Sequence, residues 1–265
     1  MPDDTYTHGH HGSVLRSHTW RTVENSAGYL LPHLEPGTSI LDVGCGPGTI
    51  TADLADRVAP GSVLGIDRGT DVVDLAAAAH VDRAGVRFAV GDVYALDADD
   101  ATFDVVHAHQ VLQHLSDPVA ALIEMRRVCR PDGVVAVRDA DYGAFTWAPL
   151  DPVLDRWLDA YRAVARSNDA EPDAGRHLKG WALAAGFSSV EASASLWCFT
   201  DEQDRAWWGG LWADRVVESD LARQLVDGGH ATTADLDGFA AAFRRWADAP
   251  DGWFIVPHGE VLARP

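Results

Sequence analysis

The sequence predicts a doubly wound α/β fold, because three features of a parallel sheet occur together between residues 39 and 142. Short apolar segments rich in β-branched residues alternate with segments of helical periodicity. These segments are hydrophobic almost throughout, as strands are when helices cover both faces of a parallel sheet. A glycine-rich turn follows the first of them. Right-handed crossovers would then give a mostly parallel sheet, for which we predict seven strands with an antiparallel last strand.

Five predicted strands and their helices account for this part of the chain. The strands are Ser39–Gly44, Ser62–Asp67, Val86–Asp92, Phe103–His109 and Gly133–Ala140. Helices are predicted for the segments TITADLADRV, DVVDLAAAAHVDRAG and DPVAALIEMRRVCRPDG. The last of these ends at a proline and a glycine, which is a typical helix stop.

After Tyr142 the pattern becomes mainly helical. Helices are predicted over Asp151–Arg166 and Arg176–Gly186, a strand over SSVEASASLWCFT, and a closing strand in GWFIVPHGEVLARP. A helical, Trp-rich block lies between these last two strands. We therefore predict four parts: an N-terminal helical segment over residues 1–35, the core of the fold over 36–200, a helical insertion over 201–249, and the closing strand of the core sheet over 250–265.

The composition excludes several classes of protein. The 265 residues carry a net charge of -19, which disfavours binding to nucleic acids or to anionic membranes. Three scattered cysteines form neither a disulfide framework nor a zinc site, so a reducing cytoplasm is the simplest location. No apolar run reaches membrane-spanning length, and no signal peptide is recognisable.

The most specific stretch is LDVGCGPGTI, which follows the first strand and opens a helix. Its glycines are Gly44, Gly46 and Gly48, and a dinucleotide-binding turn would need a further glycine where Thr49 stands. Glycines at such a turn allow positive φ angles and let a ligand lie against bare backbone. Asp42 precedes the turn, where a carboxylate would repel a diphosphate and attract an ammonium group.

The stretch from Asp42 to Gly48 resembles motif I of the class I methyltransferases that use S-adenosyl-L-methionine (SAM). The order of strands and helices, the closing GEVLARP and the segment GSVLRSHTWRTVENSAGYLLPHL resemble the UbiE-like small-molecule branch (methyltransferase type 11/25). The resemblance implies a Rossmann-like core, SAM as the cofactor and transfer of its methyl group to a small molecule. The Trp-rich insertion departs from the quinone-methylating relatives and puts a quinone acceptor in doubt.

The resemblance also implies that SAM contacts the ends of the first four strands. Asp67 lies about 20 residues after the turn and would accept hydrogen bonds from the ribose hydroxyls. Asp92 would bind the adenine amino group with the Val93 backbone beside it, and His109 and Gln110 would contact the methionine part. The predicted cofactor-binding residues are Asp42, Gly44, Cys45, Gly46, Gly48, Asp67, Arg68, Asp92, Val93, His109, Gln110, Tyr6 and Arg21.

The segment THGHHGSVLRSH raises the question of a metal site, but its histidines are too irregularly spaced for one helix face, and we predict no metal. His10, Val14, His18, Arg21 and Asn25 follow one another at helical spacings and would share a face. In the resembling methyltransferases this segment closes over SAM as a lid. Arg21 would then pair with the SAM carboxylate, and Tyr6 would help to close the site. The alternative is an amphipathic helix with a solvated polar face.

Methyl transfer from a sulfonium needs alignment of the reactants, exclusion of water and, for many acceptors, a base. Asp139, Asp141 and Tyr142 lie at the end of the fifth strand, where alternation would send Asp139 and Asp141 to one side and Arg138 to the other. We name Asp141 as a candidate base together with His18 and His10. The alternative is that these aspartates pair with Arg138 or cap helices.

The acceptor pocket is expected between the N-terminal lid and the Trp-rich insertion, which would act as a cap. Trp208 and Trp212 share a helix face there, close to Trp207, and could enclose a planar or apolar acceptor. Alternatively, these tryptophans pack the insertion onto the sheet or form the contact of a homodimer.

The sequence thus predicts a methyltransferase that transfers a methyl group by in-line displacement to a small-molecule acceptor, for example a secondary metabolite. Two alternatives stay open. A SAM-binding regulatory protein would carry the same motif, and an NAD-dependent oxidoreductase would share the fold class, although Thr49 and Asp42 count against it.

Overall fold

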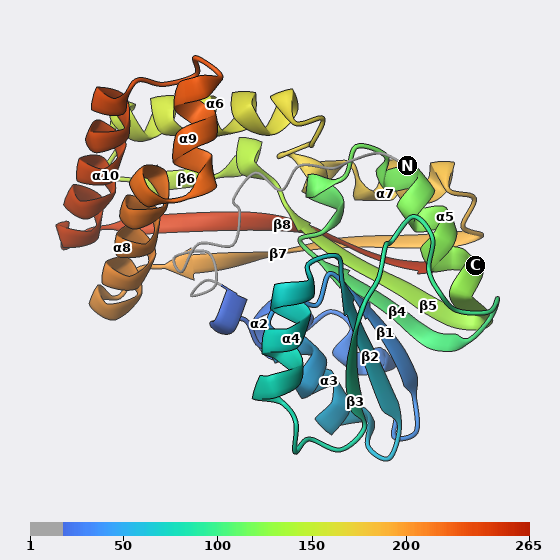
Figure 1. Cartoon of the computed structure of the whole chain (residues 1–265). Helices are drawn as coiled ribbons and strands as arrows, with labels where there is room; N and C mark the ends of the chain where they lie inside the picture. The colour runs from blue at the N-terminus through green and yellow to red at the C-terminus, as the bar shows by residue number, and fades with distance from the viewer. Residues whose placement is uncertain (1–17) are drawn as a thin grey trace.

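The apolar segments form a mixed eight-stranded sheet over residues 18–265, the part of the chain that the computed structural model describes (Figure 1). The strand order is β3-β2-β1-β4-β5-β8, and both β7 and β6 pair with β8. The strands are β1 (Ser39–Val43), β2 (Ser62–Asp67), β3 (Val86–Val90), β4 (Phe103–His109), β5 (Cys129–Ala140), β6 (Thr146–Ala148), β7 (Ser189–Phe199) and β8 (Trp253–Arg264).

The predicted α/β fold and the antiparallel last strand are confirmed. Strands β1 to β5 pair in parallel, and β8 lies antiparallel between β5 and β7. The short strand β6 was not predicted, since three residues carry too little pattern to be recognised. It pairs with the first residues of β8 and so depends on a partner more than 100 positions away in the sequence.

Helices cover both faces of the parallel strands, as the continuous apolar runs require. The helices α2 and α3 pack on one face, where Ile40 of β1 meets Leu54 and Val58. On the other face, Leu41 meets Leu122 in the cluster to which α5 and α7 contribute. The helices outside the C-terminal part are α2 (Val23–Ser26), α3 (Thr49–Val58), α4 (Thr70–Ala79), α5 (Pro118–Val128) and α7 (Leu178–Ala184), with short 3-10 turns η1 (Leu31–His33), η2 (Leu112–His114), η3 (Tyr142–Ala144) and η4 (Ala174–Arg176).

A second group of helices gathers at the far end of β7 and β8, away from the parallel strands (Figure 1). It consists of α6 (Pro152–Ser167), α8 (Glu202–Glu218), α9 (Asp220–Asp227) and α10 (Thr233–Asp248). The first part of the predicted helical insertion forms two helices, which are divided at Ser219, whose extended backbone ends α8 and begins α9. The core of this group is rich in tryptophan and phenylalanine, as Trp157, Trp212 and Phe243 illustrate.

The shared helical face predicted from His18 to Asn25 is wrong. The chain leaves the helical conformation at Arg21 and Thr22, and Thr22 begins the separate short helix α2. Thr22 and Asn25 form a capping box, in which each side chain accepts from the other residue's backbone N–H. Such a box provides hydrogen-bond acceptors for the backbone N–H groups in the first turn of a new helix, so it favours a break here over a continuous helix. Tyr6 and His10 lie outside the described residues.

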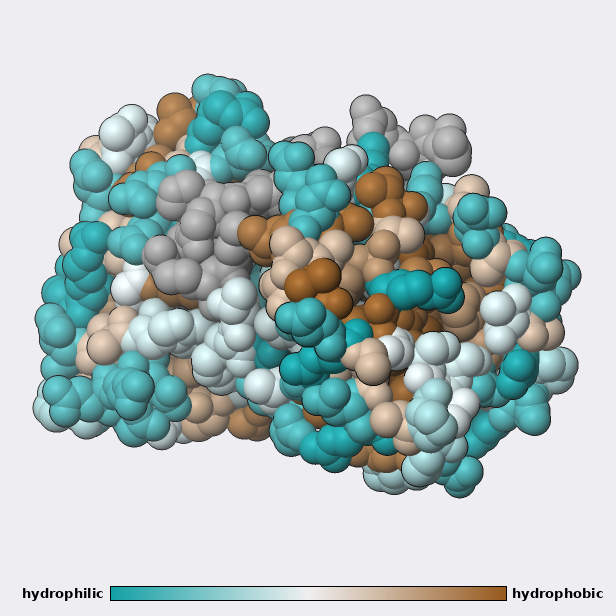
Figure 2. Space-filling view, turned by 60° about the horizontal axis from the view of Figure 1, so that its bottom comes forward, coloured by the Kyte–Doolittle hydropathy of each residue, from teal (hydrophilic) through white to brown (hydrophobic). Residues whose placement is uncertain are grey.

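The surface reflects the acidic composition. Figure 2 shows hydrophilic residues along most of the outline of one face and hydrophobic residues toward its middle. Val90, at the end of the edge strand β3, is among the apolar side chains that remain exposed. None of the helices within residues 18–265 is both long and apolar enough to cross a membrane.

Candidate active site

One continuous cavity of about 490 Å³ lies at the carboxyl ends of the parallel strands and extends to the second group of helices. Its volume is in the range of typical small-molecule sites. One end is formed by the turns after β1, β2 and β3, where ligands bind in doubly wound sheets. We call this the strand end. The other end is walled by Tyr142, Phe145, Trp197, Trp208 and Trp212, and we call it the aromatic end.

The glycine turn leaves bare backbone at the strand end. Gly44, Gly46 and Gly48 all have positive φ angles, which side chains adopt only with strain. A Cβ at Gly46 would meet nothing closer than 3.5 Å, so this backbone faces open space in the cavity wall. Gly48 is different: it does not line the cavity, and a Cβ there would come within 2.6 Å of the Phe88 ring. Its role is therefore packing of helix α3 against β3.

Asp42 lies in the cavity wall, but both of its carboxylate oxygens are already bonded. Oδ1 accepts from Nδ1 of His107 at 2.7 Å, and Oδ2 accepts from the hydroxyl of Thr51 at 2.5 Å. His107 stands directly opposite Asp42 in the register of β1 and β4. This arrangement ties the first turns of α3 to the sheet. His107, a polar residue between the apolar residues Val106 and Ala108 of β4, was the sequence signal for it.

Asp67, Arg68, Asp92 and Val93 all line the strand end of the cavity. The two carboxylate oxygens of Asp67 accept from the backbone N–H groups of Gly46 and Gly69, both at 3.0 Å. Each oxygen keeps a lone pair for a further donor. Cys45 lines the cavity beside them, and burial raises the pKa of its thiol, so the group is a neutral wall and not a reactive thiolate.

Gln110 links three elements at the middle of the cavity. His258 donates from Nδ1 to the carbonyl of Val256 at 2.9 Å, so its Nε2 accepts from the amide nitrogen of Gln110 at 2.8 Å. The amide oxygen of Gln110 accepts from Arg21. The Gln110 side chain thereby holds the Arg21 guanidinium in the cavity wall. Gln110 also has a φ of 54°, a strained conformation that is common at ligand sites.

The N-terminal segment reaches the cavity through Arg21 and His18, both of which line it. Trp20 anchors this segment: its ring lies 5.2 Å from Trp197 and 5.1 Å from Trp207 between ring centres. The carbonyl of His18 accepts from the hydroxyl of Thr49 at 3.2 Å. These two residues therefore stand beside the glycine turn even though they are not on one helical face.

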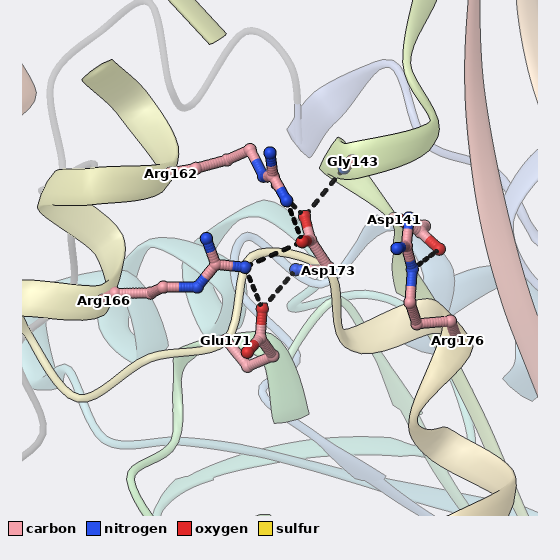
Figure 3. A network of polar contacts seen from close by, with 7 residues as sticks. All are labelled: Asp141, Gly143, Arg162, Arg166, Glu171, Asp173 and Arg176. Atoms are coloured by element: carbon pink, nitrogen blue, oxygen red, sulfur yellow. Dashed lines mark hydrogen bonds and ion pairs between the residues drawn. The ribbon is translucent and has the colours of Figure 1, made fainter. Parts of the chain in front are cut away.

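Asp141 does not reach the cavity, so our prediction of a catalytic base there is wrong. Its two oxygens accept from Nε and Nη2 of Arg176 at 2.7 Å and 2.6 Å, in the two-pronged geometry that guanidinium and carboxylate favour (Figure 3). The strand ends one residue earlier, at Ala140, so the alternation of side chains that we assumed does not extend to Asp141.

A second cluster beside Asp141 positions the turn η3 (Figure 3). Asp173 accepts from the backbone N–H of Gly143 at 2.7 Å and is paired with Arg162 and Arg166 at 2.5 Å and 2.7 Å. Because α6 carries both arginines, the cluster fixes η3 against this helix. That turn directs Tyr142 toward the cavity.

Asp139 is fully buried outside the cavity lining. Its Oδ1 accepts from the backbone N–H of Gln113 at 3.0 Å, and its Oδ2 has no hydrogen-bond partner among residues 18–265. Burial raises the pKa of this carboxyl to about 7. Asp139 therefore acts on the cavity indirectly, through the turn that carries Gln113.

His109 faces the cavity between its two ends. Its side chain is buried, and neither ring nitrogen has a hydrogen-bond partner within the described part of the chain. Burial, helped by the nearby Arg21 and Arg138 guanidinium groups, lowers the pKa of His109 well below its usual value. Burial also lowers the pKa of His114 to about 3. His114 differs because its Nε2 lies 3.0 Å from the Gln113 amide nitrogen.

The aromatic end contains two residues that the sequence did not indicate. Trp197 projects from β7 and lies 5.8 Å from the His109 ring. Arg215 on α8 is 5% exposed, and its guanidinium carbon lies 4.7 Å from the centre of the Trp212 ring. Arg215 follows Trp212 by three positions, so helical spacing was the available signal for it. Trp208 and Trp212 line the cavity, whereas Trp207 packs against Trp20 outside it.

No group of three or more metal-ligating side chains is arranged to hold a metal ion within residues 18–265. The strand end instead suits a cofactor that lies against bare backbone and offers hydroxyl and amino donors. The open backbone at Gly46 and the remaining lone pairs of Asp67 both fit such a group.

Comparison with known proteins supports this interpretation. Residues 34–189 match the sequence model of a methyltransferase domain. The chain is 35% identical over 268 residues to an uncharacterised methyltransferase of Schizosaccharomyces pombe, with 97% of this chain and 95% of the relative covered. A demethylmenaquinone methyltransferase of Beutenbergia cavernae is 33% identical over 145 residues, which cover 54% of this chain and 58% of that protein.

A solved structure shares the fold. The phosphoethanolamine N-methyltransferase 2 of Haemonchus contortus, in complex with phosphomonomethylethanolamine and S-adenosylhomocysteine, superposes with a TM-score of 0.55 at 17% identity. The match covers 88% of this chain and 50% of that one.

Proposed function

Because this chain belongs to the methyltransferase domain family, whose methyl donor is SAM, we propose that it methylates a small-molecule acceptor bound at the aromatic end of the cavity. The observation that carries the proposal is the continuity of one cavity from the glycine turn to the aromatic end. A bound cofactor and an acceptor could meet there without solvent between them. Excluding water strengthens the electrostatic interactions that align the two reactants.

The cofactor would lie at the strand end. Gly44, Cys45 and Gly46 would bring bare backbone against it, and Asp67 would accept hydrogen bonds from the two ribose hydroxyls. Asp92 and the Val93 backbone, with Arg68 nearby, would surround the adenine. Gly48 is left out of this set because it packs against Phe88.

The amino-acid part of the cofactor would lie toward the middle of the cavity. Arg21, which Gln110 holds in place, would pair with its carboxylate, because a guanidinium binds a carboxylate through two parallel hydrogen bonds. His18 would cover the same region from the N-terminal segment. The donor supplies a methyl group that is already activated by the positive sulfur. The protein therefore has to align the reactants, exclude water and accept a proton where the acceptor releases one.

Thermal unfolding with added ligand tests the proposal. S-adenosylhomocysteine (SAH) at about 100 times its dissociation constant should raise the melting temperature by about 5 °C, since binding to the folded state alone stabilises it. NADH should give no shift. A shift with NADH and none with SAH would overturn the proposal and favour the oxidoreductase.

A second measurement separates a methyltransferase from a protein that only binds SAM. Incubation with SAM and mixed hydroxylated or amino-substituted small molecules should yield SAH together with a product heavier by one methylene unit. If SAH binds but no acceptor of any class is methylated, the chain is a SAM-binding protein without transferase activity.

A further inference from the structure

We propose that the acceptor is a planar aromatic or enolic molecule with an acidic hydroxyl group, and that His109 removes the proton of this hydroxyl as the oxygen is methylated. This inference rests on the proposed function, and it names the acceptor class and the base for that same site. Four features of the aromatic end carry it: its shape, its buried polar atoms, their spacing and its charge.

The shape of the aromatic end suits a flat ring. Five aromatic side chains wall it, and they come from η3, β7 and α8 and from the Phe145 that follows η3. Aromatic walls favour offset-stacked or edge-to-face contacts with another ring. The walls are also fixed, because Trp208 stacks on Phe199 at 4.4 Å and Trp197 donates its indole N–H to the carbonyl of Asn25 at 2.7 Å.

Two side chains that line the cavity carry buried polar groups with hydrogen-bonding capacity left over. The ring nitrogens of His109 have no partner among residues 18–265, and neither does the indole nitrogen of Trp208. Both side chains are at most 5% exposed and both line the cavity. A neutral imidazole offers one N–H and one lone pair, whereas an indole offers only an N–H. A hydroxyl group complements this set, since it can donate to His109 and accept from Trp208.

The two groups stand along the same side of β7. Trp197 of this strand contacts His109, and Phe199, two residues on, stacks against Trp208. Residues two apart on a strand point to the same face and are separated by roughly 7 Å. His109 and Trp208 both line the cavity beside this face of β7, so a hydroxyl group bound between them could reach the imidazole.

The charge of the aromatic end favours an acceptor with an acidic hydroxyl group over an amine. The carboxylates that line the cavity within residues 18–265 are Asp42, Asp67 and Asp92, and all of them follow or belong to strands at the other end. The aromatic end holds the Arg215 guanidinium instead. A positive charge stabilises a phenolate or enolate and disfavours an ammonium group. An acceptor that ionises to an anion is therefore preferred to a protonated amine.

His109 is suited to accept this proton. Burial and the surrounding positive charges lower the pKa of its imidazole, so the ring is neutral and one nitrogen has a lone pair at neutral pH. The lowered pKa also makes the ring a weaker base, so the proton moves as the new oxygen–carbon bond forms, when the hydroxyl becomes strongly acidic. In the transfer, the O–H bond of the acceptor breaks and its proton moves to the free ring nitrogen of His109. The oxygen uses an electron pair to bond the methyl group, while the carbon–sulfur bond breaks and its electron pair remains on sulfur. The imidazolium then returns its proton to solvent when the product leaves.

The test uses binding, so it does not depend on knowing the natural acceptor. The full chain is saturated with SAH, and the affinities of 2-naphthol and naphthalene are measured by calorimetry. We expect 2-naphthol to bind about ten times more tightly, because one hydrogen bond to a buried, unpaired group is worth about 1.4 kcal/mol. Benzylamine, which is a cation at neutral pH, should bind at least ten times more weakly than 2-naphthol.

Substitutions of His109 and Trp208 test which side chains contact the hydroxyl group of 2-naphthol. His109→Phe should bring the ratio of the two affinities to about one while leaving the affinity for naphthalene unchanged. His109→Gln keeps an acceptor oxygen and should restore part of the preference. Trp208→Phe, which removes only the indole N–H, should lower the ratio by a smaller factor. The control His177→Phe changes an exposed histidine outside the cavity lining and should leave the ratio as in the wild type.

The results separate this inference from the proposed function. SAH affinity is measured for every variant, and retained SAH binding shows that the protein is folded and that the strand end is intact. With SAH bound, the inference is overturned if 2-naphthol does not bind, if His109→Phe keeps the hydroxyl preference, or if benzylamine binds more tightly than 2-naphthol. Failure of the wild-type protein to bind SAH would instead overturn the proposed function.

Discussion

The carboxylate of Asp42 and the imidazole of His107 are hydrogen-bonded across two neighbouring strands, with 2.7 Å between Oδ1 and Nδ1. Both side chains are buried, and the hydroxyl of Thr51 bonds the second carboxylate oxygen. A polar group in the middle of a sheet is tolerated only when its hydrogen bonds are made. These bonds tie the first strand, the fourth strand and helix α3 together below the glycine turn.

Asp42→Ala should therefore destabilise the fold by about 3 kcal/mol, because it leaves the His107 N–H and the Thr51 hydroxyl without an acceptor. Asp42→Asn keeps one acceptor oxygen and should cost about 1 kcal/mol. The free energy of unfolding in urea measures both changes. Asp56→Ala, an exposed aspartate of α3, is the control. A loss of less than about 0.5 kcal/mol for Asp42→Ala would contradict a structural role for these bonds.

Asp67→Ala should weaken SAH binding by about 10- to 100-fold, as expected for the loss of charge-assisted hydrogen bonds to hydroxyl groups. Calorimetry of SAH binding gives the ratio directly. The matched control is Asp71→Ala, an exposed aspartate at the start of α4. Equal affinities for the wild type and Asp67→Ala would remove Asp67 from the cofactor site.

Two glycines of one turn should respond differently to alanine. Gly48→Ala places a Cβ 2.6 Å from the Phe88 ring at a φ of 82°, and we expect a loss of stability of about 3 kcal/mol with SAH affinity largely kept. Gly46→Ala meets no close neighbour, so its cost in stability should be about 1–2 kcal/mol from backbone strain alone. Its methyl group would project into the cavity and should weaken SAH binding about tenfold.

Unfolding in urea and SAH calorimetry on the same two variants check this contrast. The assignment of Gly48 to packing fails if Gly48→Ala is as stable as the wild type or loses SAH affinity more strongly than Gly46→Ala does.

The buried carboxyl of Asp139 should make stability depend on pH. Its pKa is about 7 in the folded protein and near 3.8 when unfolded, so the folded state holds the extra proton between these values. Stability is then fully present below the unfolded pKa and decreases as the pH rises toward 7, by up to about 1.4 kcal/mol per pH unit. Asp139→Asn cannot lose a proton and should lack this contribution.

The comparison is made between the wild type and Asp139→Asn by urea unfolding at pH 5 and pH 7. Asparagine keeps an oxygen for the Gln113 N–H, and all other titrating groups are common to both proteins. We expect the wild type to lose about 2 kcal/mol relative to the variant between these two pH values. If the difference in the free energy of unfolding between the two proteins is the same at pH 5 and pH 7, Asp139 is ionised at both pH values.

Much of the parallel sheet and the strand end of the site could be predicted from the sequence, because their signals are local. Each of the strands β1 to β4 is a mainly apolar segment of five to seven residues, and Asp42, Asp67 and Asp92 stand at or just after the ends of such segments. Strand ends of a parallel sheet meet at one edge whatever the details of packing. The proximity of Asp67 and Gly46 follows from that rule.

Local sequence patterns mispredicted the positions of side chains where a strand or helix ends earlier than the pattern suggests. Asp141 was expected to continue the alternation of β5, but the strand ends before it, and the carboxylate turns to Arg176 on η4. His18 and Arg21 were expected on one helix, but the capping box of Thr22 interrupts it. In each case a specific interaction, an ion pair or a helix cap, placed the side chain differently from what the strand or helix periodicity predicts.

The sequence by itself determined the fold class, the family and the cofactor, since these depend on local patterns: the alternation of short strand and helix segments and the glycine-rich turn from Asp42 to Gly48. Only the tertiary structure decided the composition of the aromatic end. Its walls come from residues between 142 and 215, and His109 and Trp208 are nearly 100 positions apart in the chain. Packing of the strands β7 and β8 against the tryptophan-rich helices brings these side chains together. The periodicity of the sequence does not predict that these side chains meet, because their proximity depends on how distant elements pack and not on the order of neighbouring residues.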